Sequence, residues 1–159
     1  MERYEFLDQP DGVVQDVDWL YGAALMARRE AVEQTGPMDE SFFMYSEELD
    51  WCRRFRETGW RVVYLPAAQI VHHEGKSSEQ VVAARHIHFQ TSKVRYFRKH
   101  HGRSTSEILR LFLLSTYIYQ WAREAVKWLL GHERRLRITR MKAYAAVLRS
   151  RLRPHQAGS

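Results

Sequence analysis

Short apolar blocks alternate with turn signals over the first half of the chain. An apolar run over residues 17–27, interrupted by one glycine, predicts a buried strand whose backbone closely approaches a neighbour. Residues 28–35 fit a short helix that a Gly-Pro pair stops. A longer helix is expected over 46–58, where apolar residues at spacing three form one buried stripe and a serine stands in the capping position. Short strands are expected at 61–65 and 69–72.

The second half of the chain is helical in pattern. One helix is expected from residue 79 to a stop at Gly102, a second over 104–130, and a third, strongly basic one over 133–152. The second helix carries more apolar residues than one buried stripe requires. Its longest uncharged stretch, residues 111–122, is too short to span a bilayer, because a spanning helix needs about 20 residues.

Charge divides the chain into two parts. Residues 1–84 hold 8 Lys/Arg and 16 Asp/Glu, a balance of −8, whereas residues 85–159 hold 17 and 3, a balance of +14. This asymmetry predicts an acidic, site-bearing part at 1–84 and a basic helical tail at 85–159 that binds a surface or a partner. Cys52 is the only cysteine, which excludes an intrachain disulfide and a four-thiolate zinc site and favours a reducing, cytosolic setting. No secretory signal is expected, because charged residues interrupt the first ten positions.

Four spaced motifs lie between residues 17 and 102. They read WLYGA at 19–23, DESFFMYSEELD at 39–50, GWR at 59–61 and VHHEG at 71–75. In order and spacing they resemble the acceptor-side, C-terminal half of bacterial family 2 glycosyltransferases with a GT-A fold, especially the rhamnosyltransferase-like members. The resemblance implies the α/β fold class, as a partial GT-A remnant with a few short strands, followed by a mainly α-helical, basic C-terminal region.

An inverting glycosyl transfer needs a carboxylate that takes the acceptor's proton and a cation that neutralises the departing diphosphate. Glu48 stands where the family has the aspartate of its Glu-Asp pair, so the resemblance implies that Glu48 is the catalytic base. The extra methylene moves the carboxylate by about 1 Å, and a misplacement of that size costs on the order of 100-fold in rate. Glu47 and Asp50 therefore stay open as the working carboxylate, and all three residues also fit ordinary first-turn helix charges.

The resemblance also implies acceptor-binding and metal-binding positions. The acceptor-side residues are Trp19, Tyr21, Gly22, Asp39 and Glu40. His72 resembles the family histidine that completes a metal site, and His73 is the second choice, with structural or solvated histidines as the plain alternative. For Trp19 and Tyr21 the plain alternative is core packing.

A complete GT-A enzyme begins with an α/β half that binds the nucleotide sugar and holds the metal through an Asp-x-Asp motif. Residues 16–18 spell Asp-Val-Asp, but they lie directly before the Gly-Ala segment, where the acceptor half begins, and a three-residue match is weak. We therefore expect an incomplete transferase. In the complete enzyme, a nucleotide-sugar donor such as dTDP-rhamnose and a divalent cation (Mg or Mn) would be bound, and the acceptor would be a cell-surface glycan or a polyprenyl-linked sugar. Apolar surface left uncovered favours an N-terminal-half partner or a homo-oligomer.

The basic tail has three interpretations. Trp121 and Trp128 among apolar and basic residues suit an anionic membrane surface, which would place the chain in the cytoplasm, peripheral to the inner face of the cell membrane. A helical bundle that packs on a partner explains the same pattern and would make the chain a non-catalytic interaction subunit. Nucleic acid is disfavoured despite a pI near 9.7, since the positive charge is confined to the tail and no nucleic-acid motif occurs.

Overall fold

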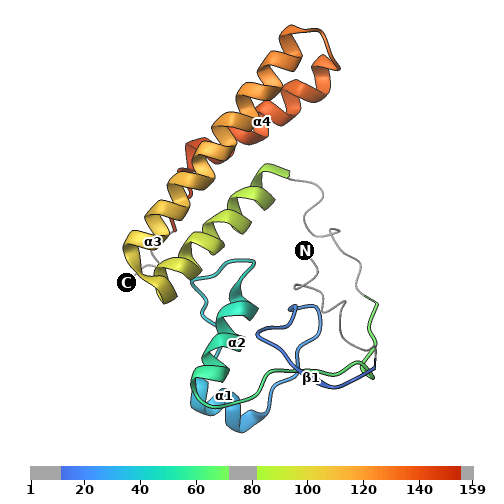
Figure 1. Cartoon of the computed structure of the whole chain (residues 1–159), viewed down its shortest axis with the longest axis vertical. Coiled ribbons are helices and arrows are strands. Elements are labelled where there is room, and N and C mark those ends of the chain that lie inside the picture. The colour runs from blue at the N-terminus through green and yellow to red at the C-terminus, as the bar shows by residue number, and fades with distance from the viewer. Residues whose placement is uncertain (1–11, 72–81, 155–159) are drawn as a thin grey trace. The chain divides into compact units, whose positions relative to one another are not determined.

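The computed structural model describes residues 12–71 and 82–154. These residues form β1 (Gln15–Asp16), α1 (Arg29–Thr35), α2 (Glu47–Glu57), β2 (Val63–Tyr64), α3 (Val82–Leu129) and α4 (Arg134–Ser150) (Figure 1). The chain forms two compact units, a first unit of residues 1–39 and 48–73 and a helical unit of residues 40–47 and 74–159. The described residues are mostly helical with two short strands, which is compatible with a partial α/β fragment.

The two strands of the first unit form a small antiparallel ladder. β1 pairs with β2 so that Gln15 lies opposite Tyr64. The amide of Val17 donates one further hydrogen bond to the carbonyl oxygen of Val62 (2.9 Å). Both valines are buried, so the residues next to the ladder belong to the core of the first unit.

The strands are shorter than the apolar pattern predicts. The prediction of a strand over 17–27 is wrong, because the segment beyond residue 17 packs apolar side chains on the core without forming a ladder. The strand predicted at 61–65 is reduced to the two residues of β2, and residues 69–71 form no strand. The apolar run is therefore only partly packed on the core, since Val17 alone is buried and residues 21–24 and Met26 are exposed.

The core of the first unit lies between α1, α2 and the residues next to the strands. Its buried side chains are Val17, Ala31, Cys52, Phe55 and Val62, two of which come from the predicted stripe of α2. Two indole N–H groups fasten the surrounding loops: Trp51 donates to the carbonyl oxygen of Gly36 (2.9 Å), and Trp60 donates to Oε1 of Gln34 (2.8 Å). Gly36 has a φ of 85°, in the region that favours glycine, so the turn that ends α1 depends on this residue.

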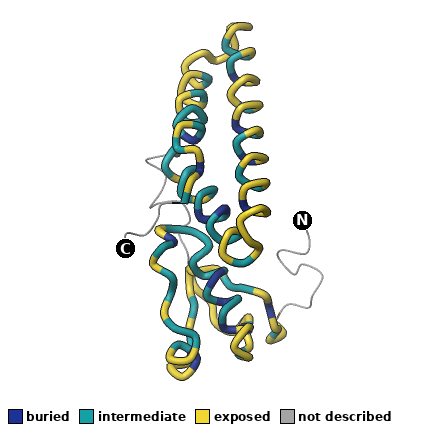
Figure 2. Tube along the Cα trace, turned by 90° about the vertical axis from the view of Figure 1, so that its left-hand side faces the viewer, coloured by how far each residue is buried: buried dark blue, intermediate teal, exposed yellow. Residues whose placement is uncertain are grey.

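The helical unit is built on α3 and α4, which lie side by side (Figure 1). α3 contains a break at Gly102, whose φ of 86° and ψ of 170° are not helical, so two helical stretches meet where the sequence pattern predicts a stop. The shared core of the unit holds Val94, Leu113, Tyr117, Val147 and Leu152. Many positions on the remaining helix surface are exposed (Figure 2). None of the helices in the described ranges is long and apolar enough to cross a membrane.

A buried carboxylate joins α3 to α4. Glu124 is fully buried and accepts a hydrogen bond from Nη1 of Arg137 (2.8 Å), while Nη1 of Arg140 lies 3.9 Å from the same carboxylate oxygen. Burial acts to raise the pKa of Glu124, but the hydrogen bond and charge of Arg137, with the charges of Arg140 and Lys127, outweigh it and lower the pKa. Glu124 is therefore ionised at neutral pH and pairs with α4 as an anion.

Candidate functional site

Gly22 lies against the first turn of α2. A Cβ atom built on Gly22 would stand 3.8 Å from Cβ and 3.9 Å from Cδ of Glu48, which are ordinary van der Waals separations. The backbone at Gly22 therefore lines the Glu48 side chain with no side chain of its own between them. The first unit thus brings together one predicted acceptor-side residue and the predicted base, although the two are far apart in the sequence.

The aromatic pair that precedes Gly22 is split between core and surface. The rings of Trp19 and Tyr21 have centroids 4.8 Å apart and an interplanar angle of 64°, an edge-to-face arrangement. Trp19 is half-buried and packs against the core of the first unit, whereas Tyr21 is 73% exposed. Core packing accounts for Trp19, while Tyr21 presents a ring that a ligand can contact.

Asp50 belongs to a buried joint between α1 and α2. Its side chain is fully buried, and its Oδ2 accepts a hydrogen bond from Nε of Arg54 (2.9 Å). The same guanidinium donates to the carbonyl oxygens of Thr35 (3.0 Å), the last residue of α1, and of Pro37 (2.8 Å), just beyond it. A carboxylate enclosed in this way has its charge balanced inside the protein and offers no surface to a substrate.

The loop of residues 40–47 is anchored on α3 within the helical unit. Phe42 is buried, with the charged ends of Arg95 and Lys99 lying 6.0 Å and 5.8 Å from its ring centroid. Ser92 fixes the loop backbone, because its hydroxyl donates to the carbonyl oxygen of Met44 (2.7 Å). These contacts explain why the motif contains a phenylalanine at this position and identify anchor residues on α3 that the sequence alone did not point to.

Two more aromatic residues of this loop also contact α3. The ring of Phe43 lies 4.7 Å from that of His88, and the ring of Tyr45 lies 5.5 Å from that of Phe89 in an edge-to-face arrangement. Phe43 is nevertheless 77% exposed, so it covers only a small part of the helix. The aromatic residues of the DESFFMYSEELD motif thus attach the chain to α3 immediately before the two candidate glutamates.

The backbone is strained directly before α2. Tyr45 and Ser46 have φ values of 70° and 68°, in the left-handed region that non-glycine residues rarely adopt. Each such residue costs on the order of 1–3 kcal/mol, and such conformations cluster at functional sites. Ser46 therefore lacks the extended backbone that is typical of a capping serine.

The remaining predicted residues near this turn differ in burial. Oε2 of Glu47 is buried and, among the described residues, has no hydrogen-bond partner. Asp39 is half-buried and belongs to the first unit, whereas Glu40 is exposed and belongs to the helical unit. Asp39 therefore belongs to the same unit as Gly22 and Glu48, whereas Glu40 does not.

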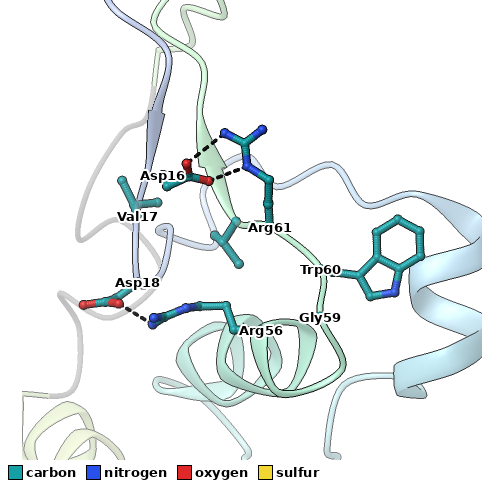
Figure 3. Close-up of a pocket in the computed structure, with 8 residues that line it drawn as sticks. Asp16, Val17, Asp18, Arg56, Gly59, Trp60 and Arg61 are labelled. Carbon is teal, nitrogen blue, oxygen red and sulfur yellow. Dashed lines mark hydrogen bonds and ion pairs between the residues drawn. The ribbon is translucent and has the colours of Figure 1, made fainter.

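The Asp-Val-Asp sequence lines a separate open cavity of about 470 Å³ in the first unit (Figure 3). Arg61 donates from Nε and Nη2 to the two carboxylate oxygens of Asp16 (2.7 and 2.8 Å), and Arg56 pairs with Asp18. The hydrogen bond from Arg61 lowers the pKa of Asp16. Both carboxylates are thus engaged by arginines, which sequence reasoning missed because the partners lie far along the chain.

Metal ligands are not gathered in the described part of the chain. Within residues 12–71 and 82–154, no group of three or more His, Cys, Asp or Glu side chains could hold a metal ion. The predicted ligands His72 and His73 lie outside the described residues. The residues that are described do not by themselves fit a divalent cation.

Residues 12–157 match the model of glycosyl transferase family group 2, and the chain belongs to this family. Among individual proteins, it is 30% identical over 158 residues to the N-acetylglucosaminyl-diphospho-decaprenol L-rhamnosyltransferase of Mycobacterium tuberculosis, across 96% of this chain and 42% of that protein. The resemblance to rhamnosyltransferase-like family 2 glycosyltransferases is thereby confirmed. The chain spans 42% of the length of this relative.

Shorter matches point the same way. The chain is 33% identical over 57 residues to the rhamnosyltransferase WbbL of Escherichia coli (strain K12), covering 36% of this chain and 22% of that protein. It is 31% identical over 61 residues to the low-salt glycan biosynthesis hexosyltransferase Agl10 of Haloferax volcanii, covering 38% of this chain and 20% of that protein. No solved structure gives a significant match.

Proposed function

We propose that this chain supplies the acceptor-binding and catalytic-base part of an inverting glycosyltransferase. The observation that carries the proposal is the close approach of Gly22 to the Glu48 side chain, which brings two separate family motifs together. Membership of glycosyl transferase family group 2 supports sugar transfer as the reaction class. The strained turn before α2 supports a functional role for the same region.

Glu48 is the proposed base. Its carboxylate would take the proton of the acceptor hydroxyl while that oxygen forms a bond to the anomeric carbon of the donor. The bond from the anomeric carbon to the diphosphate breaks, and its electron pair leaves with the nucleoside diphosphate. The first turn of α2 favours an ionised carboxylate, because the helix dipole is positive at that end. Asp50 is less suited to this task because Arg54 encloses it, and Glu47 remains the second candidate.

The acceptor is proposed to lie over the segment that contains Tyr21 and Gly22. The exposed Tyr21 ring offers an apolar face against which a sugar can stack, and the absence of a side chain at Gly22 leaves room beside Glu48. Asp39 and Glu40 are proposed as hydrogen-bonding partners of acceptor hydroxyls. Trp19 supports Tyr21 from the core side.

Donor, acceptor and cation are proposed from the relatives. The Mycobacterium tuberculosis relative is named for rhamnosyl transfer and for an N-acetylglucosaminyl-diphospho-decaprenol, which supports a dTDP-rhamnose donor and a polyprenyl-linked or glycan acceptor. We propose that sequence corresponding to the unmatched part of that relative binds the nucleotide sugar. His72, with His73 as the second choice, is proposed to help hold the divalent cation, which would neutralise the departing diphosphate. A lipid-linked acceptor would place the chain at the inner face of the cell membrane.

Substitution of Glu48 tests the proposal in the complete enzyme, formed by this chain with a donor-binding half. Transfer of rhamnose from dTDP-rhamnose to a polyprenyl-diphosphate-linked N-acetylglucosamine is expected to fall by about 100-fold or more in Glu48→Gln, because the amide cannot accept the proton. Glu48→Asp is expected to retain much more transfer than Glu48→Gln. Glu33→Gln, an exposed residue of α1, is the matched control and should leave transfer unchanged. Full transfer by Glu48→Gln would refute the base assignment.

A further inference from the structure

The second stretch of α3 has two opposite apolar faces. One face packs into the core of the helical unit through Leu113 and Tyr117. The other face carries an exposed apolar stripe, which we define as Ile108, Leu111, Phe112, Ile118, Val126 and Leu129. Each of these six side chains is more than half exposed, so the stripe has no cover in the described structure.

The spacing of the stripe makes it one continuous surface. Its members recur at intervals of three, four, seven and eight residues, which places them on a single side of an α-helix. The positions between them on the same side are Ser115, Tyr119 and Ala122, so no charge interrupts the stripe. At 1.5 Å per residue, the stripe is about 30 Å long.

Cationic and aromatic side chains border the stripe. Arg123 and Lys127 follow Tyr119 at successive steps of four residues and therefore lie along one border. Trp121 is 39% exposed on the other border, and the guanidinium of Arg134 lies 5.7 Å from the ring centroid of Trp128 near the end of the helix. An uncharged apolar face with basic and tryptophan borders is typical of a helix that lies in the interface of an anionic bilayer.

The geometry points to the apolar stripe of α3 as the surface by which this chain docks onto an anionic lipid bilayer. The helix would lie in the plane of the membrane, with the stripe at the boundary between headgroups and acyl chains. The balance of +14 over residues 85–159 complements anionic lipid, whereas an apolar groove on a protein partner would not require it. The inference rests on the proposed function only in so far as a polyprenyl-linked acceptor resides in the same bilayer.

A polarity-sensitive fluorophore tests the orientation. Ser115 is exposed in the middle of the stripe, and Thr139 is an exposed control position on α4. Cys52 is buried and burial raises the pKa of its thiol, so Ser115→Cys and Thr139→Cys can be labelled selectively. Vesicles of 30% phosphatidylglycerol in phosphatidylcholine at low salt should shift the emission at position 115 to the blue and leave position 139 nearly unchanged.

Two results would overturn the docking surface. One is an unchanged emission at position 115 with these vesicles. The other is a blue shift that rises with protein concentration without vesicles, because it would mean that a second copy covers the stripe. Neutral phosphatidylcholine vesicles should give a much smaller shift, since they lack the charge that attracts the basic border.

A binding variant separates this inference from the proposed transfer reaction. The triple variant Leu111→Ser, Ile118→Ser and Leu129→Ser should lower partitioning onto the same vesicles by at least tenfold, whereas Met26→Ser, which removes a fully exposed apolar side chain of the first unit, should not. In the complete enzyme, the triple variant should keep transfer to a water-soluble acceptor and lose transfer to an acceptor embedded in vesicles. Unchanged partitioning of the triple variant would refute the docking surface. Absence of transfer to both acceptors in the unsubstituted enzyme would instead refute the proposed function.

Discussion

Removal of the Arg54 guanidinium should destabilise the first unit far more than removal of its neighbour on the same helix. Arg54 makes three hydrogen bonds, one to the buried carboxylate of Asp50 and two to carbonyl oxygens at the end of α1. In Arg54→Met the apolar stem is retained, but the Asp50 carboxylate loses this counter-charge in a fully buried position. Breaking a buried ion pair in this way costs about 3–5 kcal/mol.

Arg53 provides the matched control. Its guanidinium pairs with Glu57 at 2.9 Å, but Glu57 has a side chain that is 54% exposed. An exposed pair of this kind contributes about 0–1 kcal/mol, so Arg53→Met should change the free energy of unfolding only slightly. The two variants lose the same chemical group from adjacent positions, so their difference reports the buried pair with Asp50 and the two hydrogen bonds of Arg54 to the end of α1.

Urea unfolding followed by tryptophan fluorescence measures the difference, because Trp51 hydrogen-bonds to Gly36 beside this joint. The midpoint for Arg54→Met should fall well below that for Arg53→Met. The double variant Asp50→Asn with Arg54→Met should recover part of the loss, since it removes the buried charge along with its partner. Equal midpoints for the two single variants would refute the structural role assigned to the Asp50–Arg54 pair.

Two further predictions concern the candidate site and the adjacent cavity. Gly22→Leu should fold normally, because Gly22 is exposed and its backbone is not left-handed. It should nevertheless lower transfer in the complete enzyme by at least tenfold, because the leucine fills the space beside Glu48. Gly22→Ala should have a much smaller effect, and equal transfer rates for the two variants would contradict the close approach of Gly22 to Glu48. Arg61 lowers the pKa of Asp16, so the stability that Asp16 contributes is complete above the ordinary aspartate value of about 3.9 and is lost as the pH falls through the folded value. The difference in unfolding midpoint between the unsubstituted chain and Asp16→Asn should therefore be small but measurable at pH 7 and should shrink below about pH 4; a difference that grows in acid would contradict the ion pair.

Local signals in the sequence predicted the helices well, because each depends on residues close together in the chain. The stripe of α2 and the break at Gly102 follow from apolar spacing and from glycine's access to positive φ. The strand expected over 17–27 failed for the opposite reason. A strand needs a partner from elsewhere in the chain, and the apolar character of a run does not report whether such a partner exists.

The candidate site, too, has features that the sequence could predict and features that depend on the fold. Resemblance to a family singled out Gly22 and Glu48 separately, but their contact depends on the fold and no local pattern contains it. The arginine partners of Asp16 and Asp18 were missed because 45 and 38 residues separate the members of the two pairs. The left-handed turn at Ser46 was missed because serine before an acidic helix start is the usual sign of a cap.

The anchoring of residues 40–47 on α3 has a consequence for how this chain can be divided or exchanged between relatives. A fragment that ends before α3 would retain residues 40–47 but lose Ser92, which bonds to Met44, and Arg95 and Lys99, which lie over the Phe42 ring. A single cut between the motif and α3 therefore separates the glutamate-bearing motif from its support. Recombination between homologous genes would have to transfer the motif and the helix jointly, and covariation between the aromatic residues of 42–45 and positions 88–99 is the trace that such inheritance would leave.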